Sequence, residues 1–435
     1  MLAYSVKIAT RSLMRNKMIS ALMVVALAIG IGAAMTTLTL SRALSGDPLP
    51  GRSDGIFRVQ LDAEPMRGHV AGGEPTKYLT RRDAEQLLAE NRADEQAVMA
   101  AGVVGIEHPR IATGVAISAA RYTSSGVFRM FAPPFLYGGG WGTAEDDARS
   151  RVTVISRKLN DRLFGGANSI GEILSLDGQS FRVIGVFDDW RPVPRFYDLS
   201  GDPFAEPEAV FMPYATAVDL ELKPNGSTVC WGDVDALAGG AIAPNAPCAW
   251  LQYWVQLQPS QKRDYHLYLE KYSDQQRADG RFWRPANVRL RDVNEWIEFN
   301  KVVPNEVRMQ TWIALGFLAV CLANSISLLL AKSLQQSGEV GLRRALGATR
   351  RQILMHSMVE VGMIGACGGL LGLLLTLIGL WVVRQQPDRY AQLAQLDAGM
   401  FAATFMLALA ASAMVGLLPA WRAMQVEPAL RIRAS

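Results

Sequence analysis

The chain has 435 residues, of which 50% are hydrophobic and 19% are charged, and its formal net charge is +4. A soluble chain of this length would usually form two or three domains, whereas here the apolar residues concentrate in four uncharged runs. The small net charge gives no argument for nucleic acid as a partner. The composition therefore indicates a membrane protein.

The chain begins with a basic segment and the first uncharged run. Residues 18–40 carry no charge, and a helix needs roughly 20 residues to cross the ~30 Å hydrocarbon core of a bilayer. The run is longer than the apolar region of about 7–15 residues in a cleaved signal peptide. We expect a cytoplasmic amphipathic helix over 1–17 and an uncleaved transmembrane helix over 18–41.

Residues 42–308 predict one large α+β domain inserted between the first two transmembrane helices. Residues 57–61 alternate apolar and polar side chains, as a half-buried strand does. Asp177-Gly178 is a favoured hairpin turn. The other expected elements are a strand at 151–156, a helix at 157–164, hairpin strands at 173–176 and 181–186, a strand at 253–257, a helix at 262–276, a strand at 287–290, and a helix running from 291 toward the second span with a bend at Pro304.

Residues 190–250 are less regular and rich in Pro, Gly and acidic residues, which predicts a long loop or insertion. Cys230 and Cys248 both fall in this stretch. In an oxidising compartment their position favours a disulfide over two unpaired thiols. Cys321 and Cys367 fall in later uncharged runs, where a free thiol is expected.

Three further uncharged runs, at 309–331, 361–383 and 398–421, predict three more transmembrane helices. Each must be helical, because a helix satisfies its own backbone hydrogen bonds in lipid. The last two helices are assigned to 358–383 and 398–421, with a short loop at 384–397 between them. The fold class is thus a membrane protein of four transmembrane α-helices, with the large α+β domain between the first and second.

The third run holds one acidic residue and a set of glycines. An ionisable group in a membrane is a functional candidate, but Glu360 opens the predicted helix, where the helix dipole favours an anion. This position favours a structural role over proton coupling. Gly365 with Gly369, and Gly368 with Gly372, have the small-xxx-small spacing of closely packed helices.

Lys and Arg in the short flanks predict the orientation. They exceed acidic residues before the first run, between the second and third, and after the fourth, whereas the 384–397 loop is balanced. Both termini and the 332–357 connection are therefore expected in the cytoplasm, with 42–308 outside it and 422–435 as a cytoplasmic tail.

The sequence offers no recognisable active site. It lacks the phosphate-binding pattern G-x-x-x-x-G-K-[ST], the zinc pattern H-E-x-x-H and the nucleophile pattern G-x-S-x-G. Asp188 and Asp189 would point to opposite faces of a strand, so a solvated turn is favoured over a metal pair. We expect no catalysis, metal or cofactor in this chain.

The most informative stretch is 338–354, which reads GEVGLRRALGATRRQIL. Small residues alternate with paired arginines, and Gly347-Ala348-Thr349 separates one short helix from the next. An ordinary positively charged loop needs the arginines but not this placement of glycine and alanine.

This stretch resembles the signature loop of the MacB/FtsX-like permeases of ABC transporters, whose pattern is approximately E-I-G-I-R-R-A-x-G-A-x-x-x-x-I. The resemblance covers most of the chain: residues 8–17 resemble the family's N-terminal helix, 152–186 its periplasmic core domain, and 418–431 its C-terminal end. That end is slightly shorter here than in the family pattern.

The resemblance implies a type VII, or mechanotransmission, transporter: a permease dimer with an ABC ATPase subunit beneath each half. ATP and Mg would be bound by the partner ATPase, which is expected to be a separate polypeptide because only residues 1–17 precede the first span. By the same resemblance, the candidate ATPase-docking residues are Glu339, Gly341, Arg343, Arg344, Gly347 and Ala348.

Several alternatives remain open at this point. The cargo could be a peptide, a small amphiphile or a lipoprotein, with or without a periplasmic adaptor and an outer-membrane channel. The second permease could be an identical copy or a diverged sister. The chain could instead be an FtsX-like regulator of a cell-wall hydrolase, or a sensor of antimicrobial peptides.

Overall fold

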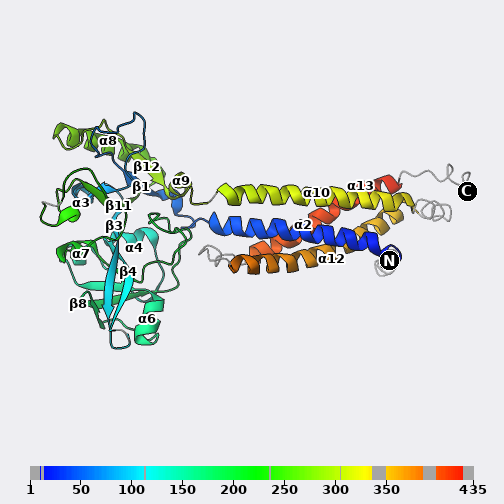
Figure 1. The fold of residues 1–435 in the computed structure, drawn as a ribbon, viewed down its shortest axis with the longest axis horizontal. Coiled ribbons are helices and arrows are strands. Elements are labelled where there is room, and N and C mark those ends of the chain that lie inside the picture. Colours follow the sequence, from blue (N-terminus) through cyan, green and yellow to red (C-terminus); the bar gives the residue numbers. More distant parts are fainter. Residues whose placement is uncertain are drawn as a thin grey trace, which may run out of the picture. The chain divides into compact units, whose positions relative to one another are not determined.

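The computed structural model describes residues 10, 14–111, 114–234, 237–303, 305–335, 349–385 and 398–424. The chain divides into two compact units (Figure 1). The helical unit joins Met1–Ser45 to Val303–Ser435, and the inserted domain is Gly46–Val302.

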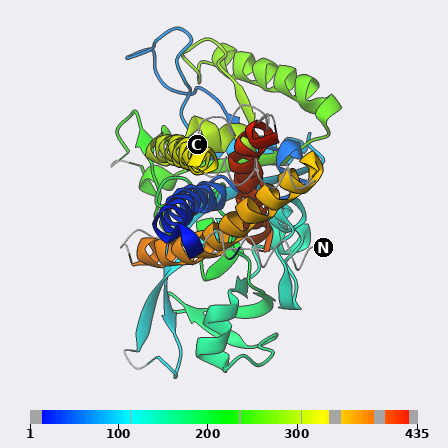
Figure 2. The ribbon, with the colours of Figure 1, turned by 90° about the vertical axis from the view of Figure 1, so that its right-hand side faces the viewer.

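Four long helices make up the described part of the helical unit: α2 (Lys17–Leu44), α10 (Asn305–Gln335), α12 (Arg350–Arg384) and α13 (Ala398–Met424). Each contains a stretch long and apolar enough to cross a membrane, which confirms the four predicted transmembrane helices. α2 packs against α10 and α12, and α13 also packs against both. Figure 2 views α2 and α10 nearly end-on, with α12 running obliquely.

The glycines of α12 allow close approach of two different helices. A Cβ atom on Gly365 would lie 1.5 Å from Ser412 Oγ of α13, and one on Gly369 would lie 2.7 Å from Ala408 Cβ. A Cβ atom on Gly368 or Gly372 would instead meet side chains of α2, at 3.1 and 2.9 Å. The two spaced glycine pairs therefore face α13 and α2 respectively, and the predicted packing role is confirmed.

The inserted domain contains a twelve-stranded sheet whose main path runs β12-β1-β11-β3-β4-β9-β6-β8-β5, with β2, β7 and β10 paired beside it. β4 pairs with β9, and β6 with β8, in parallel; the other pairs are antiparallel. The strands are β1 Ile56–Gln60, β2 Leu79–Thr80, β3 Glu95–Glu107, β4 Val115–Thr123, β5 Phe135–Gly138, β6 Val152–Ile155, β7 Ile173–Leu176, β8 Gln179–Phe187, β9 Val210–Pro213, β10 Val229–Cys230, β11 Cys248–Gln256 and β12 Arg289–Asp292.

Short helices connect these strands, so the α+β prediction is confirmed. They are α3 Arg81–Glu90, α4 Gly126–Phe131, α5 Thr143–Asp147, α6 Arg157–Phe164, α7 Tyr214–Asp219, α8 Lys262–Ala278 and α9 Val293–Phe299, with 3-10 turns at Ser53–Gly55, Gly240–Ile242 and Pro259–Gln261.

Local sequence explains the predicted β6–α6 unit and the hairpin. The Ser156 hydroxyl accepts from the Leu159 N–H at 3.3 Å and so caps α6, which ends at Gly165 with φ +71°. In the hairpin, Leu176 pairs directly with Gln179, and Asp177 and Gly178 have φ of 47° and 74°. Positive φ at both positions is the requirement of the tight turn that Asp-Gly favours.

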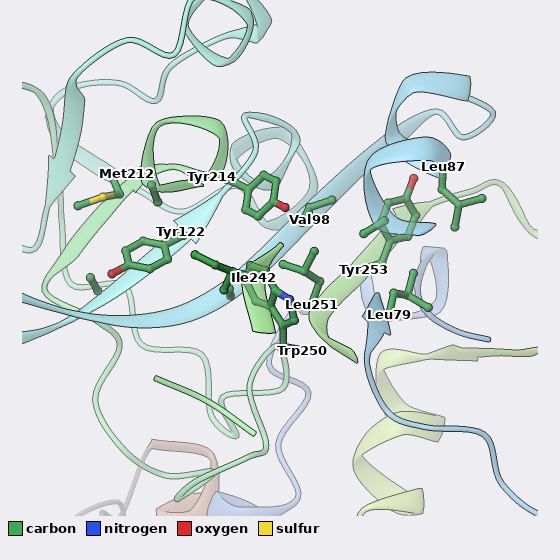
Figure 3. Packing of buried hydrophobic residues seen from close by; sticks show 14 of the residues in the cluster. Leu79, Leu87, Val98, Tyr122, Met212, Tyr214, Ile242, Trp250, Leu251 and Tyr253 are labelled. Atoms are coloured by element: carbon green, nitrogen blue, oxygen red, sulfur yellow. The ribbon is translucent and has the colours of Figure 1, made fainter. Parts of the chain in front are cut away.

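The core of the inserted domain is built around β11. All but the last residue of this strand are buried, and its side chains pack with those of β3, β4 and α3. Figure 3 shows Trp250, Leu251 and Tyr253 of β11 among Leu87, Val98 and Tyr122.

Three predictions about this domain are wrong. Residues 190–250 are not an insertion, since β9 lies between β4 and β6 in the sheet. The strand at 57–61 is not half-buried: all five residues of β1 are buried, because Phe57 and Val59 pack in one core cluster and Ile56 in another. The helix expected from 291 toward the second span ends at Phe299, and α10 begins separately at Asn305.

Candidate functional site

The connection between α10 and α12 is the candidate site indicated by the sequence. All six candidate docking residues, from Glu339 to Ala348, lie outside the described residues. The structure describes the two ends of this connection, up to Gln335 on one side and from Thr349 on the other.

Thr349 begins α12 through a capping box. Its hydroxyl accepts from the Gln352 N–H at 3.3 Å, and its own N–H donates to Gln352 Oε1 at 3.0 Å. Two of the unsatisfied donors at the helix start are thereby paired. The new helix thus begins directly after Gly347-Ala348, where the sequence predicts a break.

The prediction that Glu360 lies at the start of a helix is wrong. Glu360 lies ten residues after Arg350, the first residue of α12, and therefore about 15 Å along the helix. The helix dipole acts within the first turn, so it cannot account for an acidic residue here. The uncharged run begins at residue 361, whereas the helix begins at Arg350. A helix start inferred from the uncharged run is therefore too late.

Glu360 instead forms a buried ion pair. Lys332 Nζ donates to Glu360 Oε1 at 2.6 Å, and the two residues are only 2% and 7% exposed. Lys332 lies one turn after Leu329, and Glu360 one turn before Ile364; both apolar residues belong to a cluster that also includes Met23 of α2. The ion pair therefore lies beside this apolar cluster of the helical unit.

This pair joins the two helices that flank the connection. A charge buried without its partner costs several kcal/mol, so each residue holds the other in place. In the sequence, Lys332 is one of several basic residues beside an uncharged run. The signal that could have predicted the pair is one Lys and one Glu at the facing ends of two successive apolar runs.

The other candidate residues lie in the inserted domain. Cys230 and Cys248 form a disulfide, with Sγ atoms 1.99 Å apart, between paired residues of β10 and β11. Asp188 pairs with Arg157 at 2.7 Å. Within the described ranges, no group of three or more His, Cys, Asp or Glu side chains could hold a metal ion.

Comparison with known families covers both units. Residues 20–263 match the family of the MacB-like periplasmic core domain, and residues 311–428 match the FtsX-like permease C-terminal family. The chain belongs to the MacB/FtsX-like permeases. Members of this family are permeases of ABC transporters, and with its four apolar helices this one is a multi-pass inner-membrane protein.

Individual relatives are distant. The macrolide export ATP-binding/permease protein MacB of Syntrophobacter fumaroxidans is 22% identical over 99% of this chain and 63% of its own length. The pyoverdine export ATP-binding/permease protein PvdT of Pseudomonas aeruginosa is 26% identical over 68% of this chain and 39% of its own. The chain thus spans less than two thirds of the length of either relative.

A solved structure, the periplasmic region of MacB from Actinobacillus actinomycetemcomitans, is 11% identical with a TM-score of 0.36, over 59% of this chain and 97% of that one.

Proposed function

We propose that this chain is the permease subunit of a mechanotransmission ABC transporter. It couples ATP hydrolysis in a separate ATPase dimer to movement of the inserted domain, and so drives export or extraction of a peptide, small amphiphile or lipoprotein. The observation that carries the proposal is the buried Lys332–Glu360 pair, which links the helix ends on both sides of the arginine-rich connection. The family membership supports the same reading.

In this proposal the connection is cytoplasmic and enters a groove of the ATPase. Arg343 and Arg344 pair with carboxylates there, because guanidinium groups make strong, paired hydrogen bonds with carboxylates. Gly347 and Ala348 allow close approach of the two backbones. The basic flanks support this orientation, with both termini in the cytoplasm and Gly46–Val302 in the periplasm.

The partners follow from the same reading. The ATPase binds ATP and Mg, and a second permease, identical or diverged, completes the dimer. The relatives that are named for export of a macrolide or of pyoverdine support a secreted cargo, which an adaptor and an outer-membrane channel would carry onward.

The test reconstitutes the full chain with its ATPase in lipid nanodiscs. Arg343→Glu with Arg344→Glu is expected to abolish the stimulation of ATP hydrolysis by the permease, because like charges would then face the ATPase carboxylates. The matched control is Arg151→Glu with Arg162→Glu, the same charge change at two exposed positions of the inserted domain. Normal stimulation in the first variant would reject the proposal.

A further inference from the structure

Two arginines of the inserted domain are fully buried, and they differ in whether a carboxylate pairs with them. Arg121 of β4 is 0% exposed and contacts the carboxylates of both Asp198 and Glu208. Arg58 of β1 is 1% exposed and has no carboxylate within ion-pair distance in the described part of the chain. Since a buried charge is normally paired, Arg58 requires a different explanation.

The surroundings of Arg58 satisfy its guanidinium only in part. Nη2 donates to the Lys77 carbonyl at 2.6 Å, whereas Nε and Nη1 have no hydrogen-bond partner among the described residues. The guanidinium carbon lies 5.4 Å from the Trp254 ring and 5.2 Å from the Trp296 ring. Burial lowers the pKa of Arg58 to about 10, which still leaves it charged at neutral pH.

A second cation lies next to it. The exposed Lys77 donates through Nζ to Asn300 Oδ1 at 2.6 Å, and no carboxylate pairs with it in the described residues. Burial and the neighbouring Arg58 both lower the pKa of Lys77. Two positive charges are therefore held together, and Asp198, the carboxylate whose charge raises the pKa of Arg58, is already bound to Arg121.

Both cations line one cavity of about 340 Å³. Its walls come from six separate segments, including Tyr197 and Ser200 from the stretch before β9 and Trp296 from α9. The volume lies at the lower end of the range for small-molecule sites. Besides the two cations, the wall holds aromatic rings, hydroxyl and amide groups, and the aliphatic side chains of Leu199 and Val229. The cavity therefore suits a compact molecule with one charged end.

We propose that this cavity binds a small organic oxyanion, with Arg58 and Lys77 holding the charged group and the aromatic wall holding an apolar or aromatic body. A guanidinium forms strong hydrogen bonds with either a carboxylate or a phosphate. Nε and Nη1 lie on different edges of the Arg58 guanidinium, and neither has a hydrogen-bond partner among the described residues. The inference stands apart from ATPase coupling, because binding is measured with no ATPase present.

The experiment measures calorimetric binding to the full chain in nanodiscs, using benzoate and phenyl phosphate as probes. Benzamide, which has the shape of benzoate without its charge, is the control ligand. At least one oxyanion is expected to bind one per chain, and the preferred probe identifies carboxylate or phosphate. Arg58→Met is expected to weaken binding by about 30-fold or more. Arg82→Met, at an exposed position of α3, removes the same charge and should leave binding unchanged.

A second readout covers the case in which Arg58→Met does not fold. The preferred probe should raise the unfolding temperature of the wild-type chain, and Lys77→Met at the exposed rim should remove most of that rise. The proposal is overturned if neither oxyanion binds, if benzamide binds equally well, or if both Arg58→Met and Lys77→Met bind as tightly as the wild type.

Discussion

Lys332 and Glu360 are 28 residues apart in the chain, yet Lys332 Nζ lies 2.6 Å from Glu360 Oε1. The pair joins α10 to α12 directly, next to the connection that carries the arginines. Its side chains are 2% and 10% exposed, so both charges are largely removed from solvent. Loss of one partner and loss of both should therefore have different consequences.

Lys332→Met alone is expected to destabilise the helical unit by about 3–5 kcal/mol, because it removes the cation that pairs with the buried Glu360 carboxylate. Lys332→Met with Glu360→Leu should recover most of that stability while still uncoupling ATP hydrolysis from the permease. Thermal unfolding in detergent and stimulated ATPase activity are measured for the single and double variants. Additive stability losses would show that the two side chains do not interact.

Gly365 and Gly362 of α12 offer a matched pair for the packing argument. Gly365→Ala would place a Cβ atom 1.5 Å from Ser412 Oγ, whereas a Cβ atom on Gly362 meets nothing within 4 Å. We expect Gly365→Ala to destabilise the helical unit by about 1–3 kcal/mol, and Gly362→Ala to be neutral or slightly stabilising through helix propensity. Thermal unfolding of both variants checks this, and equal effects would contradict the α12–α13 packing.

Asp198 predicts how the stability of the inserted domain depends on pH. Burial raises the pKa of Asp198, but Arg121, Ser200 and Arg195 lower it by more, so its pKa lies well below the ordinary value. A carboxyl whose folded pKa is depressed contributes stability above its unfolded pKa of about 4 and loses it as the pH falls toward the folded pKa.

The wild-type chain should therefore exceed Asp198→Asn in stability by about 3 kcal/mol at pH 7, and the difference should shrink below pH 4. This stability difference is measured by following the unfolding of both chains by tryptophan fluorescence at several pH values. A difference that does not change between pH 7 and pH 2 would contradict the assignment.

The elements that the sequence predicts correctly are those fixed by neighbouring residues in the chain. Ser156 caps α6, and Asp177-Gly178 forms the turn between β7 and β8. Both effects are local, so this helix and this hairpin were predicted correctly. β9 has four residues with no visible period, and its place in the sheet depends on strands distant in the chain. Arg58 looks solvent-exposed in an alternating strand, but its guanidinium lies against the rings of Trp254 and Trp296, which are distant in the chain.

The candidate site shows the same division. The arginine-rich connection is visible as a contiguous motif, whereas the ion pair depends on how α10 and α12 pack. A long helix that begins before the apolar run, as α12 does at Arg350, also hides its start from any count of uncharged residues.

The disulfide between Cys230 and Cys248 closes a loop with a sequence separation of 18. Cys230→Ser with Cys248→Ser is expected to lower the stability of the inserted domain by about 3 kcal/mol, because the unfolded chain gains freedom. Alkylation of the denatured wild-type chain provides the direct check. We expect two adducts without reductant, from Cys321 and Cys367, and four after reduction; four adducts without reductant would rule out the bond.

The central claim is that residues 338–354 bind an ATPase. A photoreactive benzoylphenylalanine at Leu342, in membranes that contain the ATPase, tests it most directly, with the same group at the exposed Ile378 of α12 as the control. The account predicts a covalent adduct with the ATPase from position 342 and none from position 378. No adduct from position 342, or equal adducts from both positions, would contradict it.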